Sequence, residues 1–150
     1  MVQDEFVLGA FLPYRLNRVA ELISLRFAAQ YKARFQMTRP EWRTLAALGS
    51  TGRMTATEVG QHSSMHKTKV SRAVRSLEQR RWLKRTEDVE DRRVEHLELT
   101  SAGKKAYDEM VVLARSYEAA LAEEFGRQTV SSLLSGLAAA ERVLAAKETR

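Results

Sequence analysis

Apolar residues recur every three or four positions along most of this chain, which is the spacing of amphipathic α-helices. One such helix is predicted after Pro13, which suits a first helical turn, and it runs to about residue 35. Two more stripes, from Ala106 to Phe125 and from Val130 to Leu144, are separated by Gly126. The pattern therefore predicts a mainly helical protein with long helices towards both ends.

Two shorter helices in the middle of the chain share a start signal. Each begins with a threonine followed three residues later by a glutamate, which predicts two capping boxes, Thr38 with Glu41 and Thr55 with Glu58. The first helix is expected to reach about Leu48, where Gly49 and Gly52 would end it. The second closes after about two turns, because Gly60 and a polar segment follow.

A third short helix is predicted from residue 66 to residue 81. Its inward face is apolar and consists of Val70, Ala73, Val74 and Leu77. After Trp82 the period falls towards that of a strand, so residues 83–86 and 94–99 should pair as a hairpin whose tip is residues 87–93. This order of elements predicts a winged helix-turn-helix, and the fold class is mainly α with a small β-hairpin wing.

The chain has a net charge of +6, and its basic excess lies in one segment. Between residues 66 and 85 there are eight lysines and arginines and one acidic residue, Glu78. A run of charge is commonly only a solvated helix face, but one that holds the whole excess of a chain indicates a polyanionic partner. Because the major groove is about 12 Å wide and admits an α-helix, we expect helix 66–81 to read double-stranded DNA.

The side chains expected to contact DNA are hydroxyl or cationic groups, which suit phosphate oxygens and guanine edges. They are Lys67, Thr68, Lys69, Ser71, Arg72 and Arg75 on the helix, and Lys84 and Arg85 on the first strand. The role of Arg75 is open between a DNA contact and an ordinary ion pair with Glu78, three residues on.

The residues of this region carry a family resemblance. The segment Thr68–Arg85, the wing sequence Glu90–Val94 and the closing run Leu99–Gly103 together resemble the MarR family of transcription regulators. The resemblance extends over nearly the whole chain, since the flanking helices also match in order and length.

What the resemblance implies is one domain over residues 1–150 that works as a homodimer. Residues 1–36 and 101–150 would supply the N- and C-terminal dimerisation helices, and residues 37–100 would form the DNA-binding lobe. The dimer would place two reading helices in successive major grooves of a pseudo-palindromic site.

The resemblance also implies a role for the wing tip. In this family an arginine at the tip enters the minor groove, and an aspartate two residues before it holds it. The matching residues are Asp91 and Arg93, with Arg92 between them. A narrow minor groove favours an inserted guanidinium because its negative potential is enhanced. Taken alone, these residues would be a solvated turn with surface ion pairs.

Arg75, on the reading helix, departs from the family, because many relatives carry an acidic residue at that position.

Members of this family usually respond to small molecules, often aromatic acids or their conjugates. We therefore expect a repressor that an aromatic carboxylate or its thioester conjugate releases from DNA. The residues of the first helix that suit an aromatic anion are Tyr14, Arg15, Arg18 and Arg26. Arg15 and Arg18 are three apart and so face roughly the same side. The other interpretation is that these are surface side chains without a ligand.

Several kinds of chemistry are missing from the sequence. It has no cysteine and none of the common nucleophile, phosphate-loop or zinc-protease motifs, so neither an enzyme nor a cofactor is expected. His62, His66 and His96 fall on three predicted elements, which argues against a metal site. No signal peptide or membrane span follows the acidic start, residues 1–5, so a cytoplasmic location is expected.

Two other functions stay open at this point. One is an architectural DNA-binding protein without an effector, and the other is a helical interaction scaffold that binds no DNA.

Overall fold

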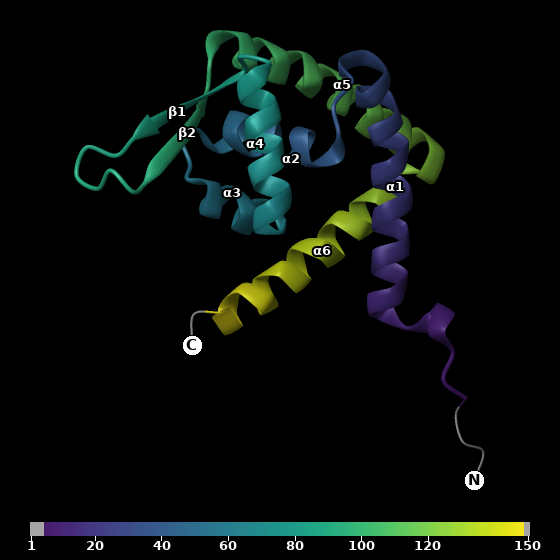
Figure 1. Cartoon of the computed structure of the whole chain (residues 1–150). Coiled ribbons are helices and arrows are strands. Elements are labelled where there is room, and N and C mark those ends of the chain that lie inside the picture. The colour runs from purple at the N-terminus through teal and green to yellow at the C-terminus, as the bar shows by residue number, and fades with distance from the viewer. Residues whose placement is uncertain (1–4, 149–150) are drawn as a thin grey trace. The chain divides into compact units, whose positions relative to one another are not determined.

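The computed structural model describes residues 5–148, so most of the acidic start and the outer ends of the two predicted dimerisation segments lie outside the described residues. Figure 1 shows the elements, which are a short 3₁₀ helix η1 (Leu8–Ala10), α1 (Leu12–Phe35), α2 (Arg39–Thr51), α3 (Ala56–Ser63), α4 (Lys67–Gln79), β1 (Leu83–Glu87), β2 (Glu95–Leu99), α5 (Ser101–Phe125) and α6 (Arg127–Glu148). They form two compact units, one ending at Val111 and one beginning at Val112.

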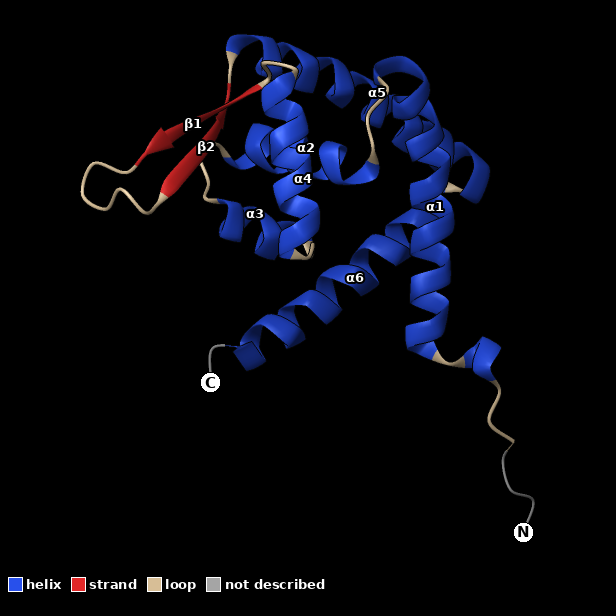
Figure 2. Ribbon diagram, viewed as in Figure 1, coloured by secondary structure: helices blue, strands red, loops and turns tan. Residues whose placement is uncertain are grey.

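The first unit contains a helical lobe and a hairpin. Figure 1 shows α4 beside α2 and α3, and α4 contacts both of these helices. The four residues predicted to face inward are all buried, namely Val70, Ala73, Val74 and Leu77. The strands pair antiparallel, from Leu83 opposite Leu99 to Glu87 opposite Glu95 (Figure 2). The predicted winged helix-turn-helix is confirmed.

One of the two predicted capping boxes is complete. The Glu58 N–H donates to Thr55 Oγ1 at 3.2 Å, and the Thr55 N–H donates to Glu58 Oε2 at 2.8 Å. At the start of α2 only half of the box forms, because the Glu41 N–H donates to Thr38 Oγ1 at 3.4 Å but the Glu41 carboxylate turns towards α4. The predicted capping role of the Glu41 side chain was therefore wrong.

The end of α2 also differs from the prediction. Gly49 does not end this helix, which continues to Thr51 and stops at Gly52, where φ is 92°. The reason for Gly49 lies in α5, since a Cβ at this position would collide with the ring of Tyr107. Gly49 is therefore a packing residue inside the helix and does not terminate it.

The end of α4, the hairpin and the start of α5 are closely packed against one another. After α4 the chain turns through Arg81, whose φ of 61° lies in the left-handed region. Thr100 Oγ1 donates to the Arg81 carbonyl at 2.6 Å and accepts from the Gly103 N–H at 3.1 Å, so Thr100 caps α5 as predicted. Gly103 lies directly against the Trp82 backbone, where a Cβ would overlap the carbonyl group.

Large apolar side chains are exposed in both units. In the first unit most of them lie between residues 6 and 25, just before and along η1 and over the N-terminal part of α1. They include Phe6, Leu8, Phe11, Leu12, Leu16, Val19, Leu22 and Leu25. In the second unit α6 has no buried residue, and its exposed leucines and valine are Leu133, Leu134, Leu137, Val143 and Leu144. Among residues 5–148, no helix has the length and apolar content needed to cross a membrane.

Candidate nucleic-acid interface

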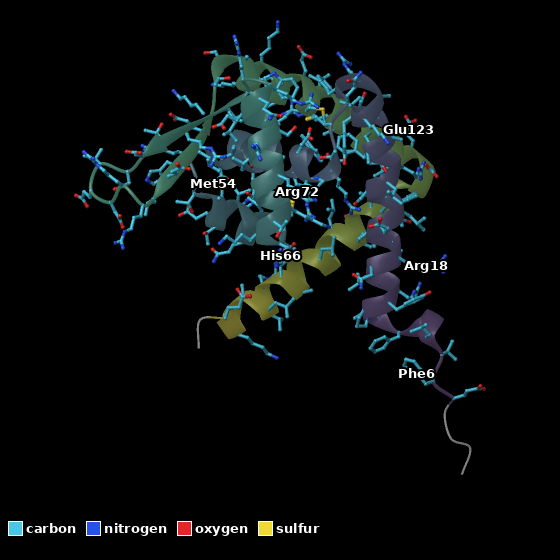
Figure 3. The ribbon with its side chains drawn as sticks, viewed as in Figure 1. Phe6, Arg18, Met54, His66, Arg72 and Glu123 are labelled. Carbon is cyan, nitrogen blue, oxygen red and sulfur yellow. The ribbon has the colours of Figure 1, made fainter. Side chains whose placement is uncertain are left out.

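The outward face of α4 carries the side chains that the sequence assigned to DNA. They are all exposed, and they are Lys67, Thr68, Lys69, Ser71, Arg72 and Arg75. Arg72 lies midway along the helix and His66 at its start (Figure 3). Within the described part of the chain, none of the four cations on this face is in an ion pair. Their charges are therefore available to a polyanion.

The start of α4 has a cap that the sequence analysis did not identify. His66 is the N-cap residue, and its Nδ1 atom accepts from the Thr68 N–H at 3.3 Å. The usual capping residues are serine, threonine, aspartate and asparagine, so a histidine gives a weak signal. The capped first turn of α4, which contains Lys67 and Thr68, is exposed and carries the positive end of the helix dipole.

Ion pairs at the base of the hairpin engage the cations that follow α4. Arg85 donates from Nε to Glu78 at 2.9 Å and from Nη1 to Glu95 at 3.1 Å, so it joins α4 to β2. The Lys84 Nζ atom lies 3.3 Å from Glu98 Oε1. The alternative pairing of Arg75 with Glu78 does not form, because Arg85 binds that carboxylate. Among the described residues Arg75 therefore has no ion pair, whereas Lys84 and Arg85 are in ion pairs at the hairpin.

The wing tip presents Arg93 to solvent in a fixed orientation. The Arg93 side chain is 91% exposed, and its Nε atom donates to Asp91 Oδ1 at 3.1 Å. Nη2 lies 3.4 Å from Asp91 Oδ2, and the Arg93 backbone N–H also donates to Asp91 Oδ1, at 3.1 Å. Asp91 therefore orients both the backbone and the guanidinium, which is the arrangement that the resemblance implied. Arg92 beside it is exposed.

A second aspartate, which the sequence analysis missed, organises the turn itself. Asp88 Oδ1 accepts from the Glu90 and Asp91 N–H groups at 2.9 and 3.1 Å, and Asp88 Oδ2 lies 2.8 Å from His96 Nε2. The hydrogen bond with His96, followed by those with the two backbone groups, lowers the pKa of Asp88 to about 2. An aspartate that bonds the backbone two residues on is a turn signal that was present in the sequence.

These interactions predict a pH dependence of stability. Because its pKa is lowered, the Asp88 carboxylate stabilises the fold above its ordinary pKa of 3.8, and this contribution is lost as the pH falls through about 2. Thermal unfolding of the wild type and of Asp88→Asn should therefore differ most above pH 4 and converge near pH 2. A difference that stays constant over this range would contradict the role of the Asp88 charge.

The proposed effector residues are exposed along α1. Tyr14, Arg15 and Arg18 lie on adjacent turns, and Figure 3 shows Arg18 on the first half of the helix. Arg26 is also exposed but lies eight residues beyond Arg18, or about 12 Å along the helix axis. The structure thus brings together three of these four residues and separates the fourth.

A hollow in the winged helix-turn-helix was not predicted from the sequence. It has a volume of about 410 Å³ and lies between α3, α4 and β1. Its walls include apolar Met65, Val70 and Val74, with the polar groups Lys67, Ser71 and Arg85. Since the walls come from three separate elements, no local sequence pattern indicates it.

The three histidines do not meet at one site. His62 lies on α3 and His66 caps α4, whereas His96 pairs with Asp88 on the wing. Among residues 5–148 there is no group of three or more histidine, aspartate or glutamate residues arranged to hold a metal ion.

Comparison with known proteins gives the family. The model of the MarR family matches residues 35–94, which include α2 to α4 and the wing. The uncharacterised HTH-type transcriptional regulator YwoH of Bacillus subtilis is 28% identical over 114 residues, covering 76% of this chain and 82% of that protein. The MarR family transcriptional regulator SPO1453 from Silicibacter pomeroyi is 26% identical and superposes with a TM-score of 0.81, covering 93% of this chain and 99% of that one. The chain is thus similar to the MarR family in sequence over residues 35–94 and in fold over most of its length. It is therefore a MarR-type transcription regulator, and the resemblance noted in the sequence is confirmed.

A further MarR-type fold was solved with a small molecule. The structure of NadR in complex with 4-hydroxyphenylacetate superposes with a TM-score of 0.74 at 21% identity, covering 92% of this chain and 96% of that one. This similarity supports the fold of the MarR regulator described here. The matched family and these neighbours are transcription regulators rather than enzymes, and dimerisation and repression are typical of the family.

Proposed function

We propose that this MarR-type regulator is a homodimeric repressor that binds a pseudo-palindromic operator and is released by a small aromatic anion. The observation that carries the DNA-binding part is the outward face of α4. There, four cations that have no ion pair within residues 5–148 and two hydroxyl groups lie opposite a buried apolar face. The Asp91–Arg93 pair supports a second contact, in the minor groove beside the major groove that α4 would occupy.

The exposed apolar surface supports a dimer. Several large apolar side chains on α1 and on α6 are 43–66% exposed, which is costly in water and typical of a surface that a partner covers. A second copy of the chain is the partner that gives two reading helices for a two-fold-symmetric site. Residues 1–36 and 101–150 remain the proposed dimerisation segments and residues 37–100 the DNA-binding lobe.

The experiment that tests this function compares a side chain expected to contact base edges with one expected to contact only phosphates. Wild-type protein should select a palindromic sequence from a random-sequence pool, and Arg72→Ala should then lower its preference for that sequence. The expected loss is about 1–3 kcal/mol for each half-site if Arg72 bonds a base edge. Lys84→Ala is the matched control, because Lys84 is paired with Glu98 and would act on phosphates alike in every sequence. Equal changes in specific and competitor binding for both variants would contradict this division.

The same experiment separates the other functions. An architectural DNA-binding protein would bind every sequence in the pool alike, and an interaction scaffold would not shift a DNA fragment at all. Light scattering should give about twice the chain mass of 17.0 kDa. A monomer that binds the selected palindrome tightly would contradict the proposed dimer.

The effector part of the proposal rests on the first half of α1. Tyr14, Arg15 and Arg18 combine an aromatic ring with two cations, which suits an aromatic carboxylate or its thioester conjugate, and Arg26 would extend the site. The neighbour NadR, whose fold this chain shares, was solved with the aromatic acid 4-hydroxyphenylacetate. Because the chain has no cysteine, its DNA binding should not respond to peroxide through a thiol.

The corresponding prediction is a loss of response without a loss of DNA binding. At least one aromatic carboxylate or thioester conjugate should lower operator affinity about tenfold, a coupling of about 1.4 kcal/mol. The double variant Arg15→Ala, Arg18→Ala should bind DNA normally and lose that response. If the double variant responds like the wild type, the effector binds elsewhere, and the hollow between α3, α4 and β1 is the next site to test.

A further inference from the structure

Glu41 is a buried carboxylate whose partners lie far away in the sequence. Only 7% of this residue is exposed. Its Oε1 atom accepts from Ser76 Oγ at 3.1 Å, and its Oε2 atom accepts from Arg80 Nη2 at 3.2 Å. Both donors lie at the end of α4 or directly after it, so this carboxylate links the first turn of α2 to the last turn of α4.

Arg80 extends this link to α1. Its Nη1 atom donates to the Phe35 carbonyl at 2.8 Å, and its Nη2 atom donates to the Gln36 carbonyl at 2.9 Å. Phe35 is the last residue of α1, and Gln36 is its left-handed C-cap, with φ at 54°. The guanidinium also lies 5.0 Å from the ring centre of Trp82, next to β1. One side chain therefore joins the end of α1, the start of α2 and the end of α4.

The character of these bonds separates Arg80 from the other cations of the basic segment. Its side chain is only 27% exposed, and both terminal nitrogens have protein partners. A guanidinium holds its donors in a rigid planar fork, so several bonds to different elements also fix the angles between those elements. Arg80 is thus poorly placed to bind a phosphate and well placed to set the direction of α4 relative to α1.

The direction of α4 matters for a dimer that reads two half-sites. Two reading helices must lie one helical turn of DNA apart, about 34–36 Å, to enter successive major grooves. The apolar face of α1 belongs to the proposed dimer interface, whereas α4 belongs to the proposed DNA interface. Only three residues, Gln36 to Thr38, connect α1 to α2. Any freedom at this connection would therefore change the separation of the two reading helices.

We infer that Arg80, together with Glu41, is a positioning residue that fixes α4 relative to α1 and thereby sets the half-site spacing that the dimer accepts. This inference rests on the proposed function. It concerns the geometry of the dimer and not a contact with DNA, so it predicts a change in spacing preference in addition to any change in affinity.

The first test uses the DNA fragment that the wild-type protein selects from a random-sequence pool. One base pair is inserted between its half-sites, and the affinity ratio of the two fragments is measured. The wild type should lose about tenfold or more on insertion, and Arg80→Met should lose about threefold or less. Arg80→Lys, which keeps the charge but not the fork, should give an intermediate ratio. Arg34→Met, an exposed arginine near the same end of α1, is the matched control and should keep the wild-type ratio.

The outcomes of this test are distinct. If Arg80→Met weakens binding to both fragments by the same factor, Arg80 stabilises the lobe without setting the spacing, and the inference is overturned. A wild-type protein that binds no DNA fragment would instead refute the proposed function on which the inference rests.

A second test needs no DNA. Because the chain has no cysteine, Lys69→Cys gives one spin-label site per copy on the exposed face of α4. The distance between the two labels in the dimer reports the separation of the reading helices. Its distribution should be narrow with Arg80 present and clearly broader with Arg80→Met or, if that variant does not fold, with Arg80→Lys. An unchanged width in a folded dimer would overturn the inference.

Discussion

Arg93→Ala is expected to weaken operator binding by about 30-fold or more. A lost contact of this kind costs about 1–3 kcal/mol, and a dimer loses it at both half-sites. The physical reason is that the Arg93 guanidinium is almost fully exposed and is already oriented by Asp91, so little rotamer freedom remains to be lost on binding. Titration of the selected operator with wild type and variant, at one salt concentration, measures the effect.

Two neighbouring substitutions serve as controls for this prediction. Arg92→Ala removes an equal charge from the wing tip, next to Arg93, and should cause a smaller loss that is similar on operator and on random DNA. Asp91→Ala should fall between the two, because it keeps the guanidinium but removes the group that orients it. If Arg92→Ala and Arg93→Ala behaved identically, the assignment of the minor-groove contact to Arg93 would be wrong.

Gly103→Ala is expected to cause the largest loss of stability among the glycine substitutions. Its Cβ would overlap the carbonyl group of Trp82, and backbone atoms cannot move aside as a flexible side chain can. The start of α5 would have to shift away from the hairpin, at a cost of about 3 kcal/mol or more in the free energy of unfolding. For a chain of this size the melting temperature should fall by roughly 6–12 °C.

Gly136→Ala is the matched control. Gly136 lies inside α6, and a Cβ there would meet nothing within 4 Å. Alanine is the better helix former, so this variant should gain about 0.5–1 kcal/mol. Both proteins must be compared at one concentration, since the stability of a dimer depends on it. If the two variants melted at the same temperature, the close approach of Gly103 to Trp82 would not hold.

Features whose partners lie within a few residues could be predicted from the sequence. Thr55 and Glu58 form their capping box, and Thr100 caps α5, because each cap bonds the backbone three residues on. The buried face of α4 could be predicted from the helical spacing of its apolar residues alone. In each case the sequence neighbour is also the physical partner, so a short window of sequence contains the whole interaction.

Features whose partners lie far away could not be predicted in this way. Glu41 has the same local sequence context as Glu58, but its side chain bonds Ser76 and Arg80, which are 35 and 39 residues away. Gly49 looked like a helix terminator because the ring of Tyr107, on α5, is not part of the local pattern. Such choices depend on tertiary packing, which overrides local preference.

The candidate DNA interface likewise contains residues that could be predicted from the sequence and contacts that could not. The exposed cations of α4 followed from helical periodicity, and the Asp91–Arg93 pair followed from the family resemblance. The pairing of Arg85 with Glu95 and of Asp88 with His96 needed the register of the two strands. That register depends on the length of the tip, which the sequence bounded only approximately.

Ion pairing within the basic segment limits how much of its charge can act on DNA. Three of the eight lysines and arginines between residues 66 and 85 already have a carboxylate partner, namely Arg80, Lys84 and Arg85. Each phosphate that a protein neutralises releases condensed counterions, and the logarithm of the binding constant then falls by roughly 0.9 for each tenfold rise in salt. A paired cation releases fewer counterions, because its carboxylate keeps part of its charge. Association with DNA should therefore depend less steeply on ionic strength than the basic sequence of this segment suggests.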